Sequence, residues 1–452
     1  MVPSLRCNEK TRITALCHNP LNARQFSMRT PRRKQPGINR LNSLVHEAPR
    51  RDVYLLIAAR TLRMFGAGVM SVVLVLYLVA NGITPAGTGF LITAGLVVSS
   101  LLTLRITTLA DRVGRRRALL LSTCPAILAA VILVGWHSAV ALSTAVVVGF
   151  LPPASKEVGP FQALEQAALA SRATGRSRTK LYAVYNMAGM LAAATGAFAA
   201  GGISLVSLAK KAQGSTQYHP IMLMYLAAIV ISSVVYLFIS PHVEPQHKLS
   251  QPRATGRDGL SSSRKTVAVL SSLFAMDAFG GGLVLQSYIA YWFHIRFGAS
   301  VAVIGSTLFG ANLLAGISAL AAAAISNRIG LVNTMVFTHV PSNVLLMLVP
   351  LMPNLSLAIL VLMLRFSISQ MDVPTRQAFL MAAVQPEERS AAAGITGVAR
   401  TAGSAAAPSV AGVLLNAYGP AAIPFLAAGA IKIIYDLLIL ARFGKVELRE
   451  HI

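Results

Sequence analysis

The chain has 452 residues, of which 55% are hydrophobic and only 12% charged, and its mean hydropathy is +0.63. A soluble domain carries about 25% charged residues, so this composition excludes an ordinary soluble protein. The net charge of +25 would suit a nucleic-acid partner, but the basic residues gather in a few loops and tails, which argues against that class.

Twelve apolar stretches follow one another along the chain. An apolar helix of roughly 20 residues crosses the hydrocarbon core of a bilayer. Only helices and closed barrels satisfy every backbone hydrogen bond in lipid, so we expect an all-α membrane protein with twelve transmembrane helices. The expected helices are Val53–Val79, one that ends near Thr108, Ala118–Trp136, Ala139–Leu169 (interrupted by Pro152-Pro153 and Gly159-Pro160), Leu181–Leu208, Pro220–Ser240, Thr266–Phe293, Val301–Ile325, Asn333–Met352, Leu355–Val384, Ala391–Asn416 and Ala421–Leu440.

The basic residues predict the orientation in the membrane. They gather in the N-terminal tail, in Arg112–Arg117, in Arg172–Lys180, in Lys248–Lys265 and after Arg442, which all fall on one side of the bilayer. Cytoplasmic loops carry the excess of Lys and Arg, so both termini are expected in the cytoplasm, and the plasma (inner) membrane is the expected location.

The predicted domains follow from this order of helices. They are a basic, disordered tail over 1–52, a six-helix half over 53–240, a cytoplasmic linker over 241–265, a second six-helix half over 266–441 and a cytoplasmic tail over 442–452. Three interpretations of the first residues stay open: a tail that lies on anionic lipid, a start that belongs at Met28, or an organellar targeting peptide.

A basic loop follows the second helix and reads Leu109-Ala110-Asp111-Arg112-Val113-Gly114-Arg115-Arg116-Arg117. It resembles the signature between helices 2 and 3 of the major facilitator superfamily, G-x-L-A-D-R-x-G-R-[RK], with Thr107 in place of the first glycine. The loop between helices 8 and 9 repeats part of it as Asn327-Arg328-Ile329-Gly330. A duplicated six-helix unit is typical of transporters that alternate access to a midplane site.

The resemblance implies a gate on the cytoplasmic side. Its expected members are Asp111, Arg112, Gly114, Arg115, Arg116, Glu165, Asn327, Arg328 and Gly330. Glu165 is the nearest acid for Arg112 or Arg115, and Asp111 is expected near the N-terminus of helix 11, where the helix dipole favours a carboxylate.

Charged residues within the apolar helices are expensive in a bilayer and therefore mark a pathway for substrate or protons. Arg63 and Asp277 stand at related positions in the two halves and are expected to share one cavity. Arg60 is expected to extend its charge to the headgroups, and His339 to lie at the membrane interface. The full pathway set is Arg63, Glu157, Asn186, Asp277, Gln286, Tyr288, Asn312, Arg365, Asp372, Arg376, Gln377 and Arg400, with Glu157, Asp277 and Asp372 as proton carriers.

The sequence predicts a monomeric secondary transporter of a small organic solute, driven by protons and working in export. Proton-coupled uptake of a small anion or polar metabolite stays open, as does a transport-inactive sensor with the same fold. The chain carries no metal spacing, nucleotide-binding loop or nucleophile motif, so we expect neither a cofactor nor an enzyme.

Overall fold

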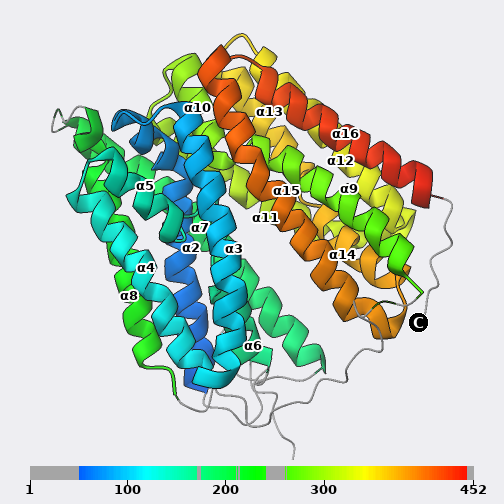
Figure 1. The fold of residues 1–452 in the computed structure, drawn as a ribbon. Helices are drawn as coiled ribbons and strands as arrows, with labels where there is room; N and C mark the ends of the chain where they lie inside the picture. The colour runs from blue at the N-terminus through cyan, green and yellow to red at the C-terminus, as the bar shows by residue number, and fades with distance from the viewer. Residues whose placement is uncertain are drawn as a thin grey trace, which may run out of the picture. The chain divides into compact units, whose positions relative to one another are not determined.

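The computed structural model describes residues 50–170, 175–209, 211, 214–240, 260 and 262–444, and its ordered elements are helices (Figure 1). They are α2 (Arg50–Ala80), α3 (Pro85–Val113), α4 (Arg115–Gly135), α5 (Ala139–Val148), α6 (Phe161–Ala170), α7 (Gly175–Ala209), α8 (His219–Leu237), α9 (Arg264–Leu283), α10 (Gln286–Phe297), α11 (Val301–Ile329), α12 (Leu331–Leu348), α13 (Leu355–Ile368), α14 (Asp372–Ala383), α15 (Arg389–Tyr418) and α16 (Ile423–Phe443), with short 3-10 turns at Gly214–Tyr218, Val349–Leu351 and Pro386–Glu388.

The helices confirm the predicted fold class. Among the described residues, eleven helical segments are long and apolar enough to cross a membrane. The fourth predicted helix is formed by two shorter helices, α5 and α6, which brings the arrangement to the expected two sets of six. Almost all of the N-terminal tail, the linker and the C-terminal tail lie outside the described residues, so the predicted domain limits stay predictions.

Three of the predicted helices are broken. The break between α5 and α6 contains Pro152, Pro153 and Gly159. Gly159 has a φ of +101°, an angle that favours glycine. The other two breaks, between α9 and α10 and between α13 and α14, lie in stretches that we expected to be continuous. The first of these comes one residue after Gly280-Gly281-Gly282, a run with low helix propensity in the last turn of α9.

The two halves repeat each other in detail. Gly114 ends α3 and begins α4 with a φ of +101°, and Gly330 ends α11 and begins α12 with a φ of +85°. These are backbone angles that side chains other than glycine rarely adopt, so both turns depend on glycine. Pro125 and Pro341 lie inside the helices that follow. The repeat read from the loops therefore extends into the helices.

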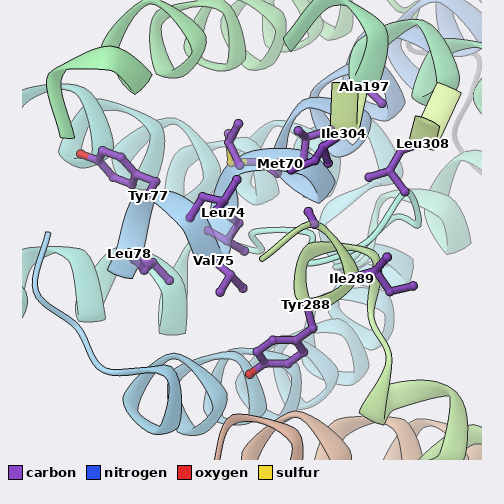
Figure 2. Packing of buried hydrophobic residues seen from close by; sticks show 14 of the residues in the cluster. Met70, Leu74, Val75, Tyr77, Leu78, Ala197, Tyr288, Ile289, Ile304 and Leu308 are labelled. Atoms are coloured by element: carbon purple, nitrogen blue, oxygen red, sulfur yellow. The ribbon is translucent and has the colours of Figure 1, made fainter. Parts of the chain in front are cut away.

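One buried apolar cluster joins the two halves. Figure 2 shows Met70 and Leu74 of α2 in the same cluster as Ile289 of α10 and Ile304 of α11. All four side chains are buried. Dispersion contacts in such a cluster are non-directional, so it joins the halves without fixing them by a particular polar bond.

The surface along which the two halves meet, called the seam below, also contains close helix contacts at glycine on both sides of this cluster. A Cβ on Gly305 of α11 would lie 2.5 Å from the carbonyl oxygen of Ala197 in α7, and one on Gly412 of α15 would lie 2.5 Å from that of Pro85 in α3. Small residues let helix backbones approach closely. Both contacts lie toward the side of the Asn81-Gly82 turn, which the charge pattern predicts to be the outer side.

Candidate functional site

A buried charge network lies in the first half. It joins Arg60 and Arg63 of α2 to Glu157, in the break between α5 and α6, and to Glu165 of α6. The helix spacing places Arg60 and Arg63 on one face of α2, because residues three apart are neighbours on a helix. Two guanidinium groups therefore face two carboxylates, and the formal charges balance.

Arg63 is the centre of this network. Its Nε donates to Glu157 Oε1 at 2.6 Å, its Nη2 donates to Glu165 Oε2 at 2.6 Å, and its Nη1 donates to the Tyr236 hydroxyl of α8. The guanidinium also lies 4.7 Å from the centre of the Phe161 ring. The planar arrangement of arginine donors suits several acceptors at once, so Arg63 ties α2, α6 and α8 together.

Glu165 is fully buried and does not bind the loop arginines as we expected. Besides Arg63, it accepts hydrogen bonds from the Tyr185 hydroxyl at 2.6 Å and the Tyr236 hydroxyl at 2.7 Å. A buried charge needs a partner and further hydrogen bonds, and these three groups supply both. The expected pairing with Arg112 or Arg115 is therefore corrected to a pairing with Arg63.

Arg60 is also buried rather than extended to the headgroups, which corrects the expectation from the sequence. Its Nη1 binds Glu157 Oε2 and lies 3.3 Å from the Tyr185 hydroxyl, and its guanidinium lies 4.3 Å from the centre of that ring. An acid and an aromatic face inside the protein thus take the place of the water and lipid headgroups.

A second network surrounds Asp277 of α9 in the other half. Its Oδ1 accepts from Lys432 Nζ of α16 at 2.5 Å, and its Oδ2 accepts from Arg376 Nη1 of α14 at 3.0 Å and from Arg400 Nη1 of α15 at 3.3 Å. Arg376 also binds Asp372 at 2.7 Å. One carboxylate is therefore shared by three cations from three helices.

A histidine–aspartate pair extends this network. His339 of α12 is buried, and its Nδ1 lies 2.8 Å from Asp436 Oδ1 of α16. Its Nε2 lies 3.4 Å from Lys432 Nζ. The predicted interfacial position of His339 is thus wrong, because Asp436 provides a buried partner. No group of three or more His, Cys, Asp or Glu residues in the described part of the chain is arranged to hold a metal ion.

Arg63 and Asp277 do not meet in this structure. Each lies in the first long helix of its half, as the repeat predicted, but the charged groups that each one binds belong to its own half. The expected contact between them is therefore not made in this conformation. Each charge finds opposite charges on helices packed beside its own, so neither needs a partner across the seam.

Neutral hydrogen bonds do cross between the halves. Gln286 of α10 accepts from the Ser155 backbone N–H at 2.8 Å and donates to Asn312 Oδ1 of α11 at 2.7 Å. Asn312 Nδ2 in turn donates to Ser155 Oγ at 3.0 Å, and Ser155 Oγ lies 3.1 Å from Ser71 Oγ of α2. The predicted pathway residues Gln286 and Asn312 thus form a polar bridge to the break between α5 and α6.

The gate arginines bind helix ends. Arg115 donates to the carbonyl oxygen of Ala167 at 3.0 Å and Arg116 to that of Leu237 at 2.7 Å, near the ends of α6 and α8. Cations near a helix C-terminus satisfy its free carbonyls and favour its dipole. Arg112, Asn327 and Arg328 are exposed. The side chain of Asp111 lies outside what the structure describes.

The remaining predicted residues have varied surroundings. Asn186 and Gln377 are exposed. Arg365 is half-buried, with its guanidinium 4.8 Å from the centre of the Phe366 ring. Tyr288 is buried and donates to the Pro408 carbonyl oxygen at 3.0 Å, so it packs α10 against α15.

Sequence reasoning did not select four residues of these networks: Tyr185, Tyr236, Lys432 and Asp436. Lys432 and Asp436 stand four residues apart in a largely apolar helix. Charged residues are expensive inside a membrane, so these two could have been selected from the sequence. A tyrosine in an apolar helix is an ordinary packing residue, so nothing marked Tyr185 and Tyr236.

A small cavity of about 30 Å³ lies beside the first network and is bordered by Arg63, Glu157 and Phe161, together with Tyr225 and Ser232 of α8. A volume of roughly 10–15 Å³ on this measure holds one water molecule. The cavity is therefore large enough for water beside the Glu157 carboxylate, whereas Glu165 has no exposed surface.

The chain is similar to known membrane proteins over most of its length. It is 26% identical over 427 residues to the "Uncharacterized membrane protein YJR124C" of Saccharomyces cerevisiae, covering 88% of this chain and 95% of that protein. Among solved structures, the nucleoside transporter NupG is 12% identical with a TM-score of 0.67, covering 86% of this chain and 98% of its own. The human organic anion transporter MFSD10 (TETRAN) is 16% identical with a TM-score of 0.57, covering 87% and 100%.

The family model of the Major Facilitator Superfamily matches residues 56–370, which include the basic loop, its repeat, the first charge network and Asp277 of the second. The low identity to the solved structures establishes the shared fold alone, and the family match adds the relationship. The chain therefore belongs to the Major Facilitator Superfamily and is a multi-pass membrane protein of the transporter type.

Proposed function

We propose that this protein is a monomeric, proton-coupled secondary transporter that exports a small organic solute by alternating access. One observation carries the proposal. The charged residues of the two networks pair within their own half, whereas the hydrogen bonds that Gln286 and Asn312 make across the seam join neutral groups. Separating a buried ion pair costs about 3–5 kcal/mol. The halves can therefore move apart without that cost.

We assign the proton to Glu157. It lies in a non-helical segment beside a cavity that has room for water, so a water molecule there can exchange a proton with its carboxylate. Protonation of Asp277 would instead leave three cations without a shared carboxylate. Protonation of Glu157 weakens its hold on Arg60 and Arg63, which loosens the joint between α2 and the break.

Orientation is part of the same proposal. The basic loops lie on the side of both termini, which we assign to the cytoplasm of the plasma membrane. Labelling single cysteines in intact cells checks this: a cysteine at Gly82 should react with an impermeant reagent from outside, and one at Ser262 should not. Reversed labelling would refute the orientation, and with it the assignment of the closed seam to the outer side.

Reconstituted vesicles test the transport. A ligand is first found by thermal-shift screening of the purified full chain, because binding stabilises the fold by mass action. Exchange of that ligand across the vesicle membrane is then measured together with the internal pH. The wild type should exchange solute and move protons, whereas Glu157→Gln should keep exchange and lose proton movement. Glu387→Gln, at an exposed residue, is the matched control.

Two results would contradict the proposal. Binding without any exchange would make the protein a sensor. Proton movement that survives in Glu157→Gln would remove the assignment of the carrier. The sign of the pH gradient that drives net accumulation of solute distinguishes export from uptake.

A further inference from the structure

Lys156 occupies the middle of the break between α5 and α6. Its neighbour Ser155 binds Gln286 and Asn312 of the second half, and its other neighbour, Glu157, binds Arg60 and Arg63 of the first. These contacts hold the backbone on both sides of Lys156. The lysine is therefore fixed at the place where the two halves meet, although its own side chain takes no part in either network.

The Lys156 side chain is exposed, unlike the charged side chains of the two networks. In the described part of the chain no carboxylate lies within ion-pair distance of it. Gln286, which binds the residue before Lys156, follows the end of α9, and that end packs on α15 one turn from Arg400, since a Cβ on Gly282 would lie 2.9 Å from the Ser404 carbonyl oxygen. Arg400 is also the charged group with the strongest electrostatic effect on Lys156. In the second network Lys432, Arg376 and Arg400 are balanced by Asp277, Asp372 and Asp436, so Lys156, which has no acid partner among the described residues, leaves one positive charge in excess.

Arg400 is the other cation that is free to take part. Its contact with Asp277 is the longest of the three that join this carboxylate to Lys432, Arg376 and Arg400, at 3.3 Å, and 32% of its side chain is exposed. Asp277 keeps Lys432 at 2.5 Å and Arg376 at 3.0 Å if Arg400 turns away. Arg400 can therefore bind another anion without leaving a buried carboxylate unpaired.

We propose that Lys156 and Arg400, one from each half, form the binding site for the anionic group of the transported solute, so that the substrate is a small organic acid bearing a carboxylate or phosphate. The proposal rests on the transport function inferred above. An anion between the two cations offsets their mutual repulsion and lowers the free energy of states in which the halves hold it together. A guanidinium also binds carboxylate and phosphate oxygens in pairs.

The charge preference of the site can be measured without knowing the substrate. In purified full chain in neutral detergent, with Cys7, Cys17 and Cys124 replaced by serine, a reporter is introduced as Lys156→Cys or Ala154→Cys. Its reaction rates with the anionic reagent methanethiosulfonate ethylsulfonate and with its cationic trimethylammonium counterpart are compared. His137→Cys, exposed between α4 and α5 among uncharged neighbours, is the control reporter.

The anionic-to-cationic rate ratio should be about tenfold higher at the Ala154→Cys reporter than at the control, as expected for an excess unit charge nearby at an effective dielectric constant of about 20. The Lys156→Gln and Arg400→Gln substitutions should each lower this ratio, and Lys211→Gln, at an exposed lysine elsewhere, should not. The Lys156→Cys reporter should also prefer the anionic reagent and lose that preference with Arg400→Gln, so the test still works if one reporter is not monodisperse.

A ratio equal to that of the control, or one unchanged by Arg400→Gln, would overturn the anion site. Transport is judged separately in the vesicles. Anion-selective labelling in a protein that exchanges no solute would leave the site and remove the transporter function. Exchange of a neutral solute by a protein without this selectivity would support the transporter function and remove the anion site.

Discussion

The two halves stabilise their buried charges in different ways. In the first half, two arginines face two glutamates, and the tyrosines of α7 and α8 complete the hydrogen bonding of Glu165. In the second, Asp277 alone joins three cations, and Arg400 remains partly exposed. The first network is closed and charge-balanced, whereas in the second, which Asp277, Asp372 and Asp436 balance, Arg400 makes the longest contact and stays partly exposed. Positions that the repeat relates thus have different charged partners in the two halves.

The difference follows from which helices supply acids. The break between α5 and α6 contributes Glu157, which binds two arginines of α2, whereas the corresponding break between α13 and α14 is followed by Asp372, which pairs with Arg376 of its own helix. The last helix of the second half adds the ammonium group of Lys432, whereas the last helix of the first half adds the hydroxyl group of Tyr236. Removing the central acid should therefore lower stability more in the second half than in the first.

The largest effect is expected for Asp277→Asn. It leaves Arg376, Arg400 and Lys432 without their shared charge, and breaking a buried pair costs about 3–5 kcal/mol. The midpoint of thermal unfolding of the purified protein should fall markedly. Asp372→Asn is the matched variant and should cost less, because Arg376 keeps Asp277. Equal losses in the two variants would show that the second network does not depend on sharing one carboxylate.

Double-mutant cycles sharpen the separation of the two networks. Arg63→Gln with Glu157→Gln should be coupled by about 0.5–3 kcal/mol, since the two side chains touch. Arg63→Gln with Asp277→Asn should add within about 0.5 kcal/mol, since no pair joins them in this conformation. The free energies of unfolding of the single and double variants give both coupling energies. A large coupling between Arg63 and Asp277 would mean that the halves share one network in another state.

The smallest effects should come from the seam, where the halves are alike. Gly412→Ala places a Cβ against the Pro85 carbonyl oxygen, and such overpacking costs about 1–3 kcal/mol. Gly394→Ala, in the same helix with open space around it, should be neutral or stabilise by up to about 1 kcal/mol. Thermal melting separates the two. Gly305→Ala and Gly202→Ala should repeat the contrast on the other side.

A Gly412→Ala protein as stable as the wild type would mean that α3 and α15 separate readily. In that event the variant should show greater cysteine accessibility along α3, which distinguishes a shifted conformation from a contact that never mattered.

The sequence by itself determined the transmembrane helices, the two-half repeat and the identity of most buried charges. Apolar length, loop charge and the cost of intramembrane ions are local properties, so Arg63, Glu157, Asp277 and Asp372 could be selected from their positions in the chain. The break at Pro152-Pro153 could also be predicted, because two successive prolines remove two backbone donors, whereas the single Pro125 stays inside a continuous helix.

Only the tertiary structure decided which charge binds which. Arg63 could reach an acid in either half, and the packing of α2 against α6 and α8 selected Glu165 and Glu157 over Asp277. His339 became a buried partner because α16 places Asp436 beside it. Lys156 is exposed, whereas its neighbours Ser155 and Glu157 are partly buried and bind residues of the two halves. Pairing depends on distances between helices, and a linear pattern of residues does not contain those distances.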